Sequence, residues 1–168
     1  MTPGEVADVL ETSGQAFAGL LRGVTPEVAS WRPAPEEWCI NECVGHIVES
    51  ENRGFAGRIR IILSADEPQL EIWDQPHVAK ARGDCEKTPQ QMLEEFEPLR
   101  RASLALVRAL KSDQLQRGGA HPKVARLTVE DVLHEWIHHD ANHLKQAYAN
   151  VQAYVWPQMG NAQRFSRP

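Results

Sequence analysis

Apolar residues recur at the three- and four-residue spacing of an amphipathic helix in four stretches of the chain. These stretches cover about residues 2–22, 39–64, 88–112 and 128–154. Thr88 and Thr128 stand where the third and fourth would begin, and a threonine there can cap a helix. No strand-like alternation of useful length occurs in the sequence. The pattern predicts an all-α protein, a single domain over residues 1–168 built as a four-helix bundle.

Two polar segments lie outside these helices. Residues 65–87 contain two prolines and separate the second helix from the third. A connection this long inside a compact domain is usually a lid, a partner surface or a disordered stretch. The tail, residues 157–168, has no periodicity, and we expect it to be partly disordered or to lie across a partner.

Composition and charge restrict the possible partners. The net charge is −5, so no overall positive field attracts nucleic acid. No apolar run approaches the roughly 20 residues that a membrane span needs, and the first residues have no signal-peptide pattern. Three cysteines, an odd count, fit a reduced protein better than a disulfide scaffold. We therefore expect a cytoplasmic protein that binds neither nucleic acid nor membrane.

Four of the seven histidines fall in the stretch "HEWIHHDANH" of the fourth helix. His139 and His143 are one turn apart and continue a stripe that is otherwise apolar, so they should point into the bundle. His134 and His138 fall on other faces, and we expect them at the surface or at a helix edge. The helical period thus selects two of the four as candidate ligands.

A third histidine, His46, stands among apolar residues of the second helix. An imidazole buried without a partner costs about 1–3 kcal/mol. Facing helices of a bundle can share one metal, and zinc, nickel, cobalt, iron and copper all accept imidazole nitrogen. The residues leave a second interpretation open, in which these are core or edge histidines hydrogen-bonded to carboxylates.

Several motifs together resemble the DinB/YfiT-like family of four-helix metalloproteins. They are "WCINECVGHIVESENR" in the second helix and "LTVEDVL" and "HDANHLKQ" in the fourth. The resemblance covers about residues 5–153. It implies an up-down-down-up bundle, often dimeric, in which His46, His139 and His143 hold a divalent metal.

The cysteines of the second helix depart from the family pattern. Cys39 stands where serine or threonine is usual, and with Cys43 it gives a C-x3-C-x2-H spacing through which a thiolate could join the metal. We favour Cys43 as a small buried hydrophobic residue. Cys85, in the polar segment, is interpreted as incidental.

Three carboxylates are candidates for supporting roles. Glu135 and Asp140 could orient the imidazoles, as metal-bound histidines usually require, although surface solvation suits each of them as well. Glu49, one helical step from His46, could act as a general base over a metal-bound water.

Three neutral histidines would leave a divalent metal, zinc or nickel, with an open position, which is typical of catalytic sites. The family resemblance favours a thiol S-transferase that combines a low-molecular-weight thiol, such as bacillithiol or mycothiol, with an electrophilic small molecule. A hydrolase in which the metal activates water is the first alternative. A non-catalytic, stress-associated metal-binding bundle is the second. In each case the resemblance implies a homodimer.

Overall fold

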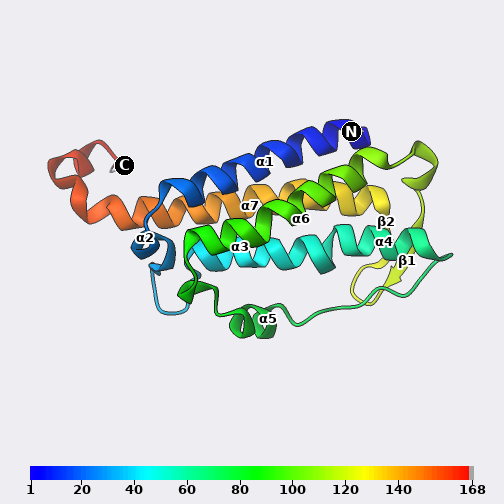
Figure 1. Cartoon of the computed structure of the whole chain (residues 1–168), viewed down its shortest axis with the longest axis horizontal. Helices are drawn as coiled ribbons and strands as arrows, with labels where there is room; N and C mark the ends of the chain where they lie inside the picture. Colours follow the sequence, from blue (N-terminus) through cyan, green and yellow to red (C-terminus); the bar gives the residue numbers. More distant parts are fainter. Residues whose placement is uncertain (167–168) are drawn as a thin grey trace.

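Four helical rods form the protein in the computed structural model, which describes residues 1–166 (Figure 1). The second rod is interrupted by one π-helical turn, η1 (Ser50–Gly54), where the sequence predicts a continuous helix. The long helices are α1 (Pro3–Gly23), α3 (Ile40–Glu49) continued by α4 (Ala56–Ser64), α6 (Pro89–Ala109) and α7 (Val129–Val155).

The order of the rods is up-down-down-up. In Figure 1, α1 and α7 run in one direction, whereas α3–α4 and α6 run in the other. Both α1 and α3 pack against α6 and α7. The predicted all-α class and four-helix-bundle topology are confirmed.

This topology explains the length of the segment between the second and third rods. Because α4 and α6 run the same way, the chain must return along the bundle, and a helix of 21 residues measures about 30 Å. The return segment, residues 65–87, is more ordered than a loop. It contains α5 (Gln75–Arg82) and a single turn, η2 (Asp84–Glu86).

Several short elements lie between the rods where the sequence predicts none. A hairpin, β1 (Gly118–His121) with β2 (Ala125–Thr128), precedes α7, and each strand is too short to show an alternating pattern. The others are α2 (Pro26–Ser30) and η3 (Ser112–Gln114), and a further element, η4 (Trp156–Phe165), follows α7. In the tail, which we expect to be partly disordered or to lie across a partner, the structure has 3₁₀ turns up to Phe165, and residues 167–168 lie outside the described residues. Among residues 1–166, no helix is both long and apolar enough to cross a bilayer.

A layer of buried polar side chains divides the core into two apolar clusters. Each rod supplies one member: Ser13, Glu51, Arg100 and Asp140. Arg100 Nη1 donates to Asp140 Oδ2 at 2.7 Å, and its Nε lies 2.6 Å from Glu51 Oε1. Buried charges are tolerated only when paired in this way, so the layer fixes how the four rods align.

Candidate metal centre

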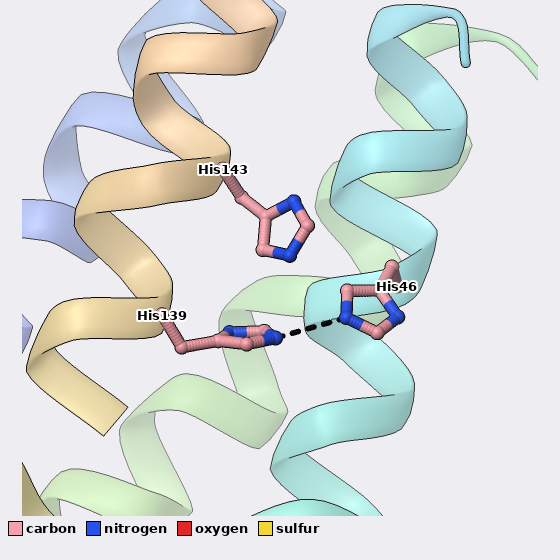
Figure 2. A group of neighbouring side chains, drawn as sticks. All are labelled: His46, His139 and His143. Atoms are coloured by element: carbon pink, nitrogen blue, oxygen red, sulfur yellow. Dashed lines mark hydrogen bonds between the residues drawn. The ribbon is translucent and has the colours of Figure 1, made fainter. Parts of the chain in front are cut away.

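Three histidines converge beside this polar layer (Figure 2). His46 comes from α3, and His139 and His143 come from successive turns of α7. Their candidate ligand atoms all lie within 4.8 Å of one another, and the Nε2 atoms of His46 and His139 are 2.9 Å apart. The structure thus brings together the three histidines that the sequence selects, and the cluster is compatible with metal binding.

The other two histidines of the α7 stretch lie elsewhere. His134 and His138 are both exposed, as the helical period predicts. His138 faces Asn142, whose Nδ2 lies 3.2 Å from its Nε2. Only the inward stripe of α7 therefore contributes to the cluster.

Aromatic rings enclose the three imidazoles. Trp38 packs on His46 and His143, with ring centroids 5.2 and 6.1 Å away. Phe55 meets His139 edge-on at 5.0 Å. Trp73, from the return segment, stacks on His46 at 5.9 Å. These rings cover part of each imidazole and give the site an apolar wall.

Burial holds the imidazoles in their neutral form. Desolvation, helped by the charge of neighbouring histidines, lowers the pKa of His46 to about 4 and that of His139 to about 3. The pKa of His143 is also lowered, mainly by burial, although its hydrogen bond with Gln146 opposes the shift. Neutral imidazoles carry the free lone pairs that a transition metal needs.

Gln146 fixes the tautomer of one candidate ligand. The Nδ1–H of His143 donates to Gln146 Oε1 at 3.0 Å, which leaves Nε2 as the lone-pair nitrogen. In His139, Nδ1 is buried and, within residues 1–166, has no hydrogen-bond partner. From the sequence we assigned Gln146 no role, although residues three positions apart on a helix lie close enough for a hydrogen bond, which could have indicated its pairing with His143. The three imidazoles fit a divalent transition metal.

Asp140 does not support an imidazole in the way the sequence suggests. Its Oδ2 accepts hydrogen bonds from Ser13 and Arg100, so the carboxylate belongs to the polar layer across the bundle. Glu135 is exposed and lines a neighbouring cavity. Within residues 1–166, neither carboxylate is hydrogen-bonded to a histidine of the cluster.

Glu49 is bound by two arginines. Its Oε1 lies 3.0 Å from Arg82 Nη1, and its Oε2 lies 2.6 Å from Arg53 Nε. Burial alone would raise the pKa of Glu49, but the hydrogen bonds from Arg53 and Arg82 outweigh it and lower the pKa. A carboxylate held this way is a weak base, which argues against the general-base role that the sequence suggests.

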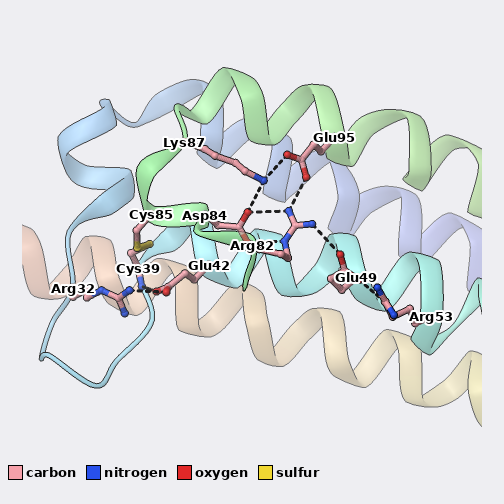
Figure 3. A network of polar contacts seen from close by, with 10 residues as sticks. All are labelled: Arg32, Cys39, Glu42, Glu49, Arg53, Arg82, Asp84, Cys85, Lys87 and Glu95. Carbon is pink, nitrogen blue, oxygen red and sulfur yellow. Dashed lines mark hydrogen bonds and ion pairs between the residues drawn. A yellow bond between two sulfur atoms is a disulfide. The ribbon is translucent and has the colours of Figure 1, made fainter. Parts of the chain in front are cut away.

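Ion pairs connect the end of the return segment to α3 near the histidines (Figure 3). Arg82 bridges Asp84, Glu49 and Glu95, and Lys87 binds the same Asp84 and Glu95. Asp84 approaches α3 so closely that a Cβ on Gly45 would lie 1.8 Å from its Oδ2. Glycine is therefore required directly before His46, and this network holds the return segment over the cluster.

A disulfide joins the same two segments. Cys39, at the start of α3, is bonded to Cys85, so the expectation of a reduced protein with an incidental Cys85 is wrong for this pair. The odd count misled because one pair and one free thiol also give three. Cys43 is the free thiol; it is buried, and desolvation raises its pKa to about 12, which disfavours a thiolate ligand.

A cavity of about 660 Å³ adjoins the cluster. Residues 72–76 of the return segment form one wall, and residues of the hairpin together with Arg58 and Glu135 form the others. Trp73 belongs to both places, since it lines the cavity and stacks on His46. The cavity therefore lies beside the histidines, with Trp73 between it and His46.

The topology and the converging histidines define the class of protein: a helical bundle with a three-histidine centre between its second and fourth rods. Comparison with known families identifies that class, because the model of the DinB superfamily matches residues 10–147. The chain belongs to the DinB superfamily.

Two proteins of Bacillus subtilis are similar to this chain in sequence. The uncharacterized protein YuaE of Bacillus subtilis is 28% identical over 146 residues, 75% of this chain and 85% of YuaE. YfiT of the same organism is 23% identical over 108 residues, 64% of this chain and 60% of YfiT.

Solved structures share the fold. That of YfiT, described as a probable metal-dependent hydrolase with an unusual four-helix bundle topology, has a TM-score of 0.81 at 19% identity, covering 92% of this chain and 88% of that one. A conserved protein of Enterococcus faecalis has a TM-score of 0.60 at 16% identity, covering 92% and 98%.

Proposed function

We propose that this protein is a metal-dependent thiol S-transferase in which His46, His139 and His143 hold a divalent transition metal, zinc or nickel. The observation that carries the proposal is the cluster of three neutral imidazoles. The inward carboxylates nearby pair with arginines and, within residues 1–166, form no hydrogen bond with the imidazoles. Glu49 is bound by Arg82, and Asp140 by Arg100. A metal held by imidazoles alone keeps its full double positive charge and an open position.

When bound, such a metal supplies Lewis acidity, which lowers the pKa of a coordinated thiol or water. The chain contributes the remaining requirements. Gln146 holds His143 in the tautomer that presents Nε2, and the rings of Trp38 and Trp73 reduce the contact of the imidazoles with water. In a partly desolvated site the electrostatic effect of a metal is larger than in water.

The proposed reaction needs no basic side chain. A low-molecular-weight thiol gives up its proton to solvent, its sulfur forms a bond to an electrophilic carbon, and the leaving group departs with the electrons of the broken bond. A metal-activated water could likewise lose its proton to solvent, but hydrolysis gains further rate from a positioned base, and the inward carboxylates are bound by arginines. This difference favours thiol transfer.

A metal-dependent hydrolase is the second candidate. It is favoured by the similarity to YfiT, which is described as a probable metal-dependent hydrolase. Glu135, which is exposed and lines the cavity one turn before His139, is then the carboxylate with the freedom to accept a proton. The small-molecule substrate and the homodimer stay predictions for either candidate.

The test measures metal and turnover on the same untagged protein. We expect close to one equivalent of a transition metal, and conversion of a chlorodinitrobenzene only when a thiol such as bacillithiol, mycothiol or cysteine is added. Hydrolysis of a nitrophenyl ester without any thiol would support the hydrolase instead. Metal without turnover in either assay would support the non-catalytic bundle.

Alanine variants of the histidines supply the control. His139→Ala and His143→Ala should each abolish metal retention, whereas His134→Ala, on the exposed side of the same helix, should retain it. Equal loss in all three variants would show that the metal binds elsewhere.

A further inference from the structure

Arg58, in the wall of the cavity, is a half-buried cation whose guanidinium is incompletely paired. Its Nε is buried and, within residues 1–166, has no hydrogen-bond partner, and its guanidinium forms no ion pair there. Two other shielded arginines, Arg82 and Arg100, are each paired with two or more carboxylates. Leaving a partly desolvated guanidinium unpaired is costly, and a bound anion would recover that cost.

His121, at the end of β1, cannot provide the missing acceptor. Its Nε2 lies 3.4 Å from Arg58 Nη2, while its Nδ1 accepts the backbone N–H of Lys123 at 3.3 Å. A neutral imidazole has one acceptor nitrogen, so it can satisfy one of these two donors but not both. Burial, and next the charge of Arg58, lower the pKa of His121, which keeps the ring neutral. Hydrogen-bond donors are therefore in excess here.

Two carboxylates, Asp74 and Glu135, also line the cavity, and within residues 1–166 neither forms an ion pair with Arg58. Asp74 caps α5, where its Oδ1 accepts the backbone N–H of His77 at 3.0 Å. Glu135 is exposed. Its charge is felt by Arg58, but burial outweighs it and the pKa of Arg58 is lowered on balance. Lys123, which also lines the cavity, adds a second cation.

We infer that Arg58 and His121 form a binding subsite for a small oxyanion, a carboxylate or a phosphate, in the cavity beside the three-histidine centre. The planar guanidinium can bind such a group through two parallel hydrogen bonds. Trp73 forms the apolar boundary between this subsite and His46.

This inference rests on the proposed function, because it assigns a substrate class to that enzyme. The substrate would be a small molecule with an anionic group at one end and its reactive atom at the other. The anion would be held by Arg58, and the reactive atom would lie toward the histidines past Trp73. Uncharged electrophiles of the same size, such as chlorodinitrobenzene, would then be converted more slowly than anionic ones.

Calorimetric titration of the metal-free protein tests the subsite, so that neither a bound metal nor turnover enters the result. The probes are benzoate, its uncharged analogue benzamide, and phenyl phosphate. We expect benzoate or phenyl phosphate to saturate at about millimolar concentration or below, and benzamide to bind at least about tenfold more weakly. The tighter of the two anions identifies the oxyanion as a carboxylate or a phosphate.

Variants of one helix locate the binding. Arg58→Gln should weaken the anion at least about tenfold, Arg58→Lys should keep part of the affinity, and Arg60→Gln, at an exposed position of the same helix, should change it less than about twofold. Circular dichroism verifies that each variant is folded. Equal affinity for benzoate and benzamide, no saturation of either anion by about 10 mM, or an unchanged Arg58→Gln would overturn the inference. If the titration detects the anion subsite but metal analysis shows that the protein binds no metal, the proposed function is refuted and the anion subsite is not.

Discussion

Replacing Gln146 with leucine should weaken metal binding without removing a ligand. The side chain accepts the Nδ1–H of His143 at 3.0 Å and so holds the ring in the tautomer that presents Nε2. Loss of such a supporting partner typically costs about 10- to 100-fold in metal affinity, or about 1.4–2.8 kcal/mol. Both residues are half-buried, so water can partly replace the amide, and we expect the lower end, about tenfold.

Competition with a chromophoric chelator measures this change directly. Asn142→Leu is the matched control, because Asn142 contacts His138 at 3.2 Å on the exposed side of the same helix. The control should keep its affinity within about twofold, since it supports no candidate ligand. Unchanged affinity in Gln146→Leu, or an equal loss in both variants, would refute the role of Gln146.

The other predictions concern the polar layer and the return segment. Arg100→Met should lower the free energy of unfolding by about 3–5 kcal/mol in urea titrations, because it leaves two buried carboxylates without their cation; a loss below about 1 kcal/mol would contradict this. Reduction of the Cys39–Cys85 disulfide should speed amide exchange in residues 75–87 more than in α1, and equal exchange rates before and after reduction would count against the tether. The pKa of Glu49 is lowered in the folded protein, so its pairing with Arg82 stabilises the fold at pH values above the ordinary glutamate pKa of 4.5. This stabilisation is lost as the pH falls below 4.5 and Glu49 becomes protonated. The free energy of unfolding, measured as a function of pH, should therefore fall more steeply below pH 4.5 for the native protein than for Arg82→Gln. Parallel curves for the two proteins would disprove the coupling.

Local periodicity was sufficient to predict the rods and the inward histidines. The stripe through His139 and His143, together with an imidazole in the second apolar helix, selected residues that the fold does bring together. Such a prediction succeeds because the face of a helix is determined by spacing within that helix alone.

The errors arose where a side chain's partner is distant in the sequence. Asp140 stands next to a candidate ligand, but Arg100, 40 positions away, binds it. The partner of Cys39 is 46 residues away, and counting cysteines cannot reveal a pairing. The hairpin that carries His121 has strands of four residues, which leave no periodic signal.

Metal analysis of the untagged protein, purified without added metal and compared with its His46→Ala variant, tests the central claim most directly. His46 is the candidate ligand that connects α3 to the pair on α7, so three-histidine coordination would require it. We predict close to one equivalent of a divalent transition metal in the native protein and less than about a tenth in the variant. A native protein that neither contains metal nor takes it up on titration, or a variant that retains it fully, would contradict the account.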